Sequence, residues 1–113
     1  MAGKFEIDAR DGEFRFNLKA GNGQVILGSE RYSSLVACQT GVESVRVHAG
    51  NEVNFHSRTA KDGSPYFALI AGNGQTIGCS QMYASAGARD DGIRAVMSNA
   101  PDAEVIDPRD AAA

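Results

Sequence analysis

Two pairs of hydroxyl side chains recur at the same separation and are the first candidates for a reactive or ligand-binding role in this chain. Ser29 is followed three residues later by Tyr32, and the pattern returns as Ser80 and Tyr83. Such a pair could contact a small ligand or supply a serine nucleophile, but a nucleophilic serine needs a base nearby, and no histidine repeats with it. In a structural role, the serine would bond to backbone at a strand exit and the tyrosine would pack over a helix start. The residue types favour this structural role.

The other residues that could bind a metal or move a proton occur singly. His48 falls at a predicted helix end, where a cation suits the terminal carbonyl groups, and His56 falls in a predicted strand. Cys38 and Cys79 have no Cys/His partners at zinc spacing. Neither Asp90-Asp91 nor the acidic residues after position 101 have the spacing of a calcium loop. The sequence therefore predicts no catalytic residue, no metal site and no cofactor.

The two Ser/Tyr pairs are 51 residues apart, and the rest of the chain repeats at the same interval. The pentapeptide 20–24 (AGNGQ) recurs intact at 71–75, and residues 11–50 match 62–101 at 17 of 40 positions. The identities fall on apolar residues, turn glycines and helix positions, with almost no charged groups among them. A fixed internal period indicates copies of one supersecondary unit stacked together. The pattern is that of duplicated scaffolding, and a duplicated reactive site would have kept its ionisable residues.

Period-2 alternation predicts three strands at the start of each copy. In copy one they cover residues 4–9, 14–20 and 24–29. The Gly21-Asn22-Gly23 turn lies between two strands and opens no helix, so it lacks the dipole of a phosphate-binding loop. We predict a three-residue loop with Gly23 in a left-handed bulge, which pairs Leu18 with Ile26. Ile26 is kept in the second copy as Ile77, whereas Leu27 is replaced by Gly78.

A helix follows the third strand of each copy. Ser33 or Ser34 can cap its free backbone N–H groups. The pattern Val36/Ala37, Thr40/Gly41, Ser44/Val45 and Val47/His48 predicts its apolar face. Gly41 and Gly92, alone in mid-helix, predict close approach of a neighbouring backbone, because each costs about 1 kcal/mol against alanine. The second helix should stop before Pro101. Strands are predicted at 52–59 and 103–107, and the residues after 107 are expected to fray.

Length and composition predict one small protein with a shared core. At 113 residues, one domain is expected, composed of repeat one (1–51) and repeat two (52–113), a monomer that is an internal pseudo-dimer. The net charge of −3 and the lack of a basic stripe disfavour nucleic acid as a partner. The chain shows no signal peptide or membrane span, and its two lone thiols indicate reduced cysteines and a cytoplasmic location. A disulfide between them is the less favoured alternative.

Several motifs, spaced in order along the chain, resemble the YegP-like family of small bacterial proteins. They cover almost the whole chain, with a looser match in the second copy, where Pro65, Ile70 and Gly87 depart from the usual types. The motifs in copy one are Phe14–Ala20, Asn22–Ile26, Ser29-Glu30, Tyr32–Ser34 and Gly41–Val45, and those in copy two are Tyr66–Gln75 and Asn99–Ala103. The resemblance implies an α+β fold in which two β-β-β-α-β units form a single, mainly antiparallel sheet with exchanged C-terminal strands. It implies no catalytic residue and no established activity.

The polar side of the hairpin strands is the best candidate for binding a partner. Arg15, Asn17 and Lys19 point away from the apolar residues of their strand, and their counterparts are Tyr66, Ala68 and Ile70. An apolar strip of that kind marks association surfaces more often than catalytic ones. The protein is therefore expected to be a small non-enzymatic scaffold that binds an unknown protein partner through its sheet face or edges. The candidate contact residues are Arg15, Asn17, Lys19, Tyr66 and Ile70. The alternatives are a ligand or enzymatic site at Ser29/Tyr32 and Ser80/Tyr83, and weak binding of single-stranded nucleic acid.

Overall fold

The computed structural model describes residues 3–107. Copy one contributes three strands and a helix: β1 (Lys4–Arg10), β2 (Glu13–Lys19), β3 (Val25–Ser29) and α1 (Leu35–His48). A short 3-10 helix, η1 (Glu52–Asn54), leads into β4 (Phe55–Thr59), β5 (Pro65–Ile70), β6 (Thr76–Cys79) and α2 (Ala86–Asn99). The second 3-10 helix, η2 (Ala100–Asp102), and β7 (Glu104–Ile106) complete the chain. The predicted element order is confirmed, although β4 begins three residues later than predicted because η1 precedes it.

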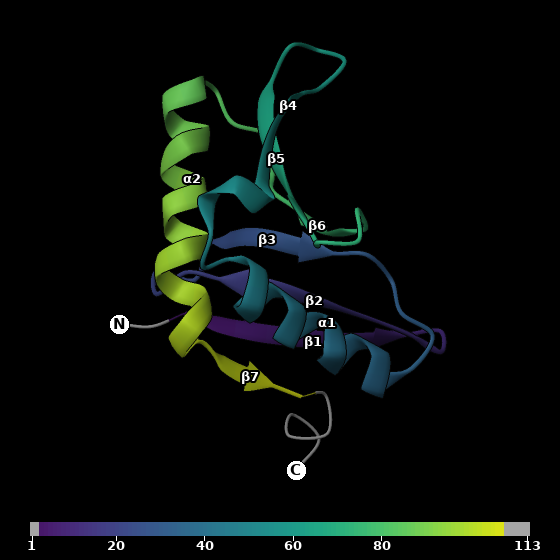
Figure 1. Ribbon diagram of the computed structural model, residues 1–113. Coiled ribbons are helices and arrows are strands. Elements are labelled where there is room, and N and C mark those ends of the chain that lie inside the picture. Colours follow the sequence, from purple (N-terminus) through teal and green to yellow (C-terminus); the bar gives the residue numbers. More distant parts are fainter. Residues whose placement is uncertain (1–2, 108–113) are drawn as a thin grey trace.

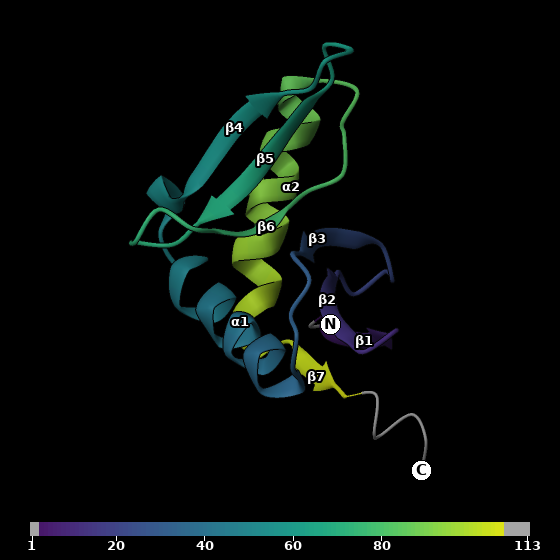
Figure 2. The same ribbon diagram turned by 90° about the vertical axis from the view of Figure 1, so that its right-hand side faces the viewer.

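All seven strands form one sheet in the order β4-β5-β6-β3-β2-β1-β7. Every pairing is antiparallel except that of β7 with β1, which is parallel. The two helices pack on the same side of the sheet, α1 against β2, β5 and β6 and α2 against β5 and β3 (Figures 1 and 2). The strand at the end of copy two therefore completes the sheet of copy one, which confirms the expected exchange.

The two copies are related by an approximate two-fold axis through the β3–β6 pair. Gly28 pairs with Cys79, its own counterpart 51 residues later. In the first strands the offset is 50, because Phe5 pairs with Leu18 and Phe55 pairs with Leu69. The turn after β1 has two residues and that after β4 has three, which accounts for the difference.

The β2–β3 hairpin differs from the prediction in its register. The three-residue loop is present: Ala20 N–H donates to Gln24 O at 2.9 Å, and Gly23 has a φ of 86°. The predicted Leu18–Ile26 pair is wrong, since Leu18 pairs with Leu27 and Lys19 with Val25. Ile26 is the extra residue of a bulge, and a bulge lets two consecutive residues be buried.

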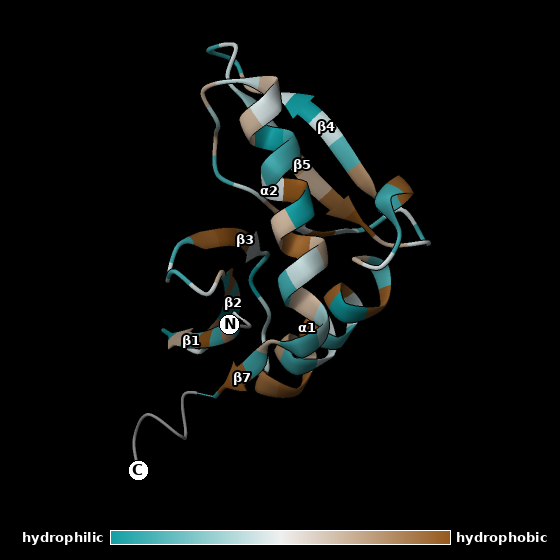
Figure 3. Cartoon of the chain, turned by 90° about the vertical axis from the view of Figure 1, so that its left-hand side faces the viewer, coloured by the Kyte–Doolittle hydropathy of each residue, from teal (hydrophilic) through white to brown (hydrophobic). Residues whose placement is uncertain are grey.

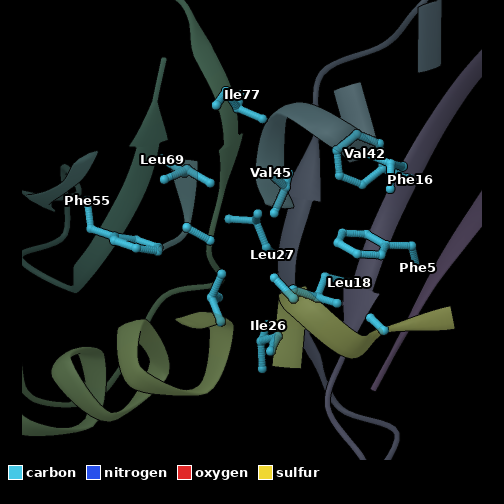
Figure 4. Close-up of a cluster of buried hydrophobic side chains, with 14 of the residues drawn as sticks. Phe5, Phe16, Leu18, Ile26, Leu27, Val42, Val45, Phe55, Leu69 and Ile77 are labelled. Carbon is cyan, nitrogen blue, oxygen red and sulfur yellow. The ribbon is translucent and has the colours of Figure 1, made fainter. Parts of the chain in front are cut away.

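The position of Leu27 explains why the repeat comparison misled the prediction. Leu27 is fully buried beside the two-fold axis, between Leu69 on one side and Phe5 and Phe16 on the other (Figure 4). A Cβ atom on its counterpart Gly78 would lie 3.2 Å from Leu27 Cγ and 2.7 Å from Gly28 O. Only one of the two related positions can hold a large side chain, so the copies differ here for reasons of space.

The helices begin as predicted, but the buried face of α1 matches the predicted one only in part. Ser34 Oγ accepts from Ala37 N, and Ser85 Oγ accepts from Ala88 N, both at 3.1 Å. The predicted apolar face of α1 is right for Gly41 and Val45, which are buried, and wrong for Val36 and Val47, which are 72% and 75% exposed. The buried residues of α1 are Cys38, Gly41, Val42 and Val45. Their i, i+3, i+4, i+7 spacing covers one face of a helix.

A tyrosine ring, and not a backbone, approaches each mid-helix glycine. A Cβ atom on Gly41 would lie 2.4 Å from Tyr32 Oη, and one on Gly92 would lie 2.2 Å from Tyr83 Oη. Each tyrosine also stacks on a core phenylalanine, Phe16 or Phe67, with ring centroids 6.3 Å apart. The glycines therefore make room for the tyrosines, which explains why both residue types occur in both copies.

Gly92→Ala should destabilise the fold although alanine is the better helix former. Overpacking against Tyr83 costs about 1–3 kcal/mol, and the propensity gain returns about 1 kcal/mol. The control is Gly87→Ala in the first turn of α2, where the nearest atom to an added Cβ, Ser85 Oγ, lies 3.9 Å away. Urea unfolding should show a lower free energy of unfolding for Gly92→Ala and an unchanged or higher one for Gly87→Ala. Equal effects would contradict the steric explanation.

Candidate functional site

Both Ser/Tyr pairs serve the fold. Ser29 Oγ accepts from Phe16 N at 2.9 Å and donates to Glu30 O at 2.7 Å, and Ser80 Oγ does the same with Phe67 N and Gln81 O. Tyr32 lines a hollow of about 190 Å³ under α1, but Ser29 does not. Burial raises the pKa of Tyr32 and of Tyr83, which keeps both phenols protonated. Hydroxyls bonded in this way are poorly placed to act as nucleophiles or bases.

His48 links the two copies. Its Nδ1 bonds Ser44 O at 2.8 Å, and its Nε2 accepts from Gly72 N at 3.2 Å. A carbonyl accepts only, so Nδ1 is the donor in the first of these hydrogen bonds. His48 thereby ties the end of α1 to the β5–β6 loop, while His56 is exposed on β4. Within residues 3–107, no three His, Cys, Asp or Glu side chains are grouped to hold a metal.

The two cysteines are free and differ in surroundings. Cys38 is buried on α1, and burial together with the nearby Asp107 carboxylate raises its pKa to about 11. Cys79 is partly exposed on β6, and burial is again the main cause of its raised pKa. A raised pKa lowers the thiolate fraction at neutral pH, so neither cysteine has the activated character of a nucleophile.

The predicted partner-binding residues lie on β2 and β5, on the sheet face away from the helices. In copy one their charges are paired within the sheet: Lys19 Nζ lies 2.9 Å from Glu6 Oε1, and Arg15 Nε lies 3.9 Å from Asp8 Oδ2. The hydrogen bond from Lys19 lowers the pKa of Glu6. Tyr66, Asn17 and Ile70 are only half-exposed. This face therefore offers neither an unpaired basic patch for nucleic acid nor a large exposed apolar patch.

The edge beside β1 shows how this fold holds an extended segment. β7 lies parallel to β1, with Phe5 opposite Val105. From α1, Arg46 donates to Ala103 O at 2.7 Å and to Pro101 O at 3.3 Å, and its guanidinium lies 5.5 Å from the centre of the Phe5 ring. Gln39 Nε2 donates to Asp107 Oδ2 at 3.1 Å. One helix and one edge strand thus form a groove that β7 fills.

The related groove beside β4 is empty of any segment from residues 3–107. We call it the β4 groove, a hollow of about 300 Å³ between β4 and α2. It is lined by Glu52, Phe55, Ser57, Asp90, Ile93, Arg94 and Met97. Phe55 is the counterpart of Phe5, and Asp90, Ile93, Arg94 and Met97 are the counterparts of Gln39, Val42, Glu43 and Arg46. Each copy therefore forms a groove at equivalent positions. No segment of residues 3–107 occupies the β4 groove, because copy one runs directly into β4 through η1.

β4 also presents unpaired backbone groups to this groove. Ala60 N–H donates to Ser64 O and closes the β4–β5 hairpin, so alternate residues back along β4 bond to β5. The residues between them, Ser57 and Thr59, direct their N–H and C=O groups to the open side, as Phe55 does with its C=O group, whereas Phe55 N–H, at the end of η1, donates to Glu52 O. β4 lies at one end of the molecule and β7 at the other, and β4 is mostly hydrophilic (Figures 1 and 3). An open strand edge of this kind can pair with another extended chain.

Sequence reasoning named edges in general but missed the residues of the β4 groove. A signal was present in the repeat comparison, where Gln39 and Arg46 become Asp90 and Met97. The significance of these substitutions becomes clear only once β7 is seen to cross to copy one, where Gln39 and Arg46 form hydrogen bonds with the C-terminal segment.

Comparisons with known proteins agree with the fold and assign no activity. The model of a domain of unknown function, DUF1508, matches residues 9–54 and again 60–107. The chain is 50% identical to a UPF0339 protein of Bordetella pertussis, over 95% of this chain and 96% of that protein. It is 46% identical to the UPF0339 protein YegP of Escherichia coli, over 95% and 98%.

Two solution NMR structures resemble this one along nearly the whole chain. The structure of YegP from Escherichia coli, a protein of unknown function, has a TM-score of 0.89 and 46% identity, and covers 96% of this chain and 94% of its own. The structure of a UPF0339 protein of Shewanella oneidensis has a TM-score of 0.88 and 44% identity, with 95% and 92% covered. Among the described residues, no helix has both the length and the apolar character needed to span a membrane.

Proposed function

The chain belongs to the UPF0339/YegP family of tandem DUF1508 proteins, and we propose that it is a non-enzymatic binding protein that takes up an extended segment of another protein along β4. One observation carries the proposal: the two sheet edges have related grooves, and β7 fills one while the β4 groove is open. Strand addition to an open edge is a common mode of peptide recognition, in which backbone hydrogen bonds supply affinity. The ion-paired charges of the sheet and the two free thiols suit a cytoplasmic protein that binds without catalysis.

The edge can be tested with Ser57→Pro. Proline removes an N–H group from the open side of β4 and leaves the bonds to β5 intact, so the fold should be kept. Random 12-residue peptides displayed on phage would be selected on the wild-type protein and then measured against purified variants. We expect the selected peptides to bind the wild type and to lose at least about tenfold in affinity for Ser57→Pro, since several backbone bonds depend on this strand.

The outer sheet face supplies the matched control. Lys19→Glu and Tyr66→Ala alter the face but not the groove, and the selected peptides should bind both variants as they bind the wild type. Peptides that bind Ser57→Pro normally and lose affinity for Lys19→Glu or Tyr66→Ala would place binding on the face and overturn the proposal. Thermal unfolding of each variant confirms that a lost affinity is not a lost fold.

A further inference from the structure

We propose that the segment bound in the β4 groove runs parallel to β4 and places a small residue, an aliphatic residue and a lysine or arginine at alternate positions facing α2. This inference rests on the proposed function and specifies its partner. The occupant is a segment of another protein, and the structure supplies a template for it in β7.

The template shows which positions of a bound strand face the helix. Ala103 and Asp107 are 2% and 7% exposed, and Val105 packs on the core between them, whereas Glu104 is exposed. Alternate residues of a strand point to the same face, so positions 103, 105 and 107 form one row. In and beside β7 this row consists of a small residue, an aliphatic residue and an acidic residue. The pairing of Phe5 with Val105 predicts that the aliphatic residue of the guest lies opposite Phe55.

The last position of the row must differ in the β4 groove. In the filled groove, Gln39 donates a hydrogen bond to Asp107. Its counterpart Asp90 is a carboxylate, half-exposed, with Arg89 Nε at 3.4 Å from one oxygen. Glu52 adds a second carboxylate, and the one guanidinium in the lining, Arg94, is already bonded to Asp91. Glu52, Asp90 and Asp91 outnumber Arg89 and Arg94 here, so an acidic guest residue would meet net negative charge and a basic one would meet opposite charge.

The chain's own C-terminal strand is a poor occupant for the same reasons. A β7 strand from a second copy would place Asp107 against Asp90. It would also lose both hydrogen bonds from Arg46, because Met97 stands at that position and cannot donate. The thioether of Met97 instead suits an apolar contact.

The test uses two nine-residue peptides with blocked ends. The aspartate peptide copies residues 99–107, and the lysine peptide has lysine in place of the final aspartate. Binding is measured by titration with NMR detection of the full-length protein. We expect the lysine peptide to bind the wild type about tenfold more tightly than the aspartate peptide, as a charge pair replaces a like-charge contact.

Variants locate that preference. Asp90→Asn should remove most of it, and the matched control Glu30→Gln, at an exposed carboxylate outside the groove lining, should keep it. The double variant Asp90→Gln/Met97→Arg rebuilds the wall that holds β7 and should reverse the preference in favour of the aspartate peptide. Ser57→Pro should weaken both peptides.

Orientation is tested with a spin label on either end of the lysine peptide. In a parallel arrangement, a label on the N-terminal end broadens signals near Glu52, and one on the C-terminal end broadens signals near Thr59. Equal affinities of the two peptides, a preference that survives Asp90→Asn, or the opposite broadening pattern would each overturn this inference. The proposed function would still stand if display-selected peptides depend on Ser57. Self-association lost in Ser57→Pro would identify a second copy as the occupant and likewise overturn the inference.

Discussion

Copy one expressed alone, residues 1–59, should not fold as a monomer. The fragment loses β6 and β7, the strands that pair with β3 and β1, and it loses the β5 and β6 residues on which α1 packs. A unit of this size buries too little apolar surface to be stable alone. We expect an unfolded chain or a dimer, with circular dichroism for structure and analytical sedimentation for mass as the measurements.

The two-fold axis makes the dimer of this fragment unfavourable. A dimer would bring two copies of Leu27 to the site where the whole chain places one leucine and Gly78. We therefore expect the unfolded form to dominate at micromolar concentration. A folded monomer in sedimentation would show that the copies do not depend on one another, and would contradict the shared core.

Leu27→Ala should cost more than any other change considered for the intact chain. Leu27 has no exposed surface and packs where the two copies meet. Truncating a buried leucine costs about 2–5 kcal/mol, because burial is lost and a cavity remains. Domains of this size are stable by about 5–15 kcal/mol, so the variant should unfold at clearly lower urea. Both copies should still unfold in a single transition, as seen by fluorescence of the tyrosines and by helix circular dichroism.

The control is Val36→Ala on α1. This valine is 72% exposed, and surface substitutions away from special features change stability by about 0.5 kcal/mol or less. If Leu27→Ala matched Val36→Ala, Leu27 would not be a residue that holds the copies together. Separate transitions for the two probes would show that the halves unfold independently.

The two helices differ at the positions that line the grooves. Arg46 and Gln39 hold β7 through its carbonyl groups and its final carboxylate. Met97 and Asp90 occupy the same places beside β4 and can do neither. The groove beside β1 therefore matches the C-terminal segment, whereas the β4 groove lacks both contacts. The same difference leaves the β4 groove with its own charge, on which the proposed specificity depends.

Local patterns predicted the elements because local physics determines them. Strand alternation, the Ser34 and Ser85 caps and the turn at Gly23 each depend on a few neighbouring residues. The buried face of α1 was predicted only in part: the pattern included Gly41 and Val45, missed Cys38 and Val42, and added the exposed Val36 and Val47. The Tyr32–Gly41 contact was missed in the same way, since it joins residues from different elements.

The repeat in the sequence was enough to predict one unit written twice and the order of its strands and helices. How the copies meet became visible in the folded chain: Leu27 keeps its side chain opposite Gly78, Ile26 forms a bulge, and β7 covers the edge beside β1. A repeat reports only what both copies share. At the two-fold axis there is room for one of two related side chains, and at the edges β7 fills one of two related grooves, so the copies differ in those places.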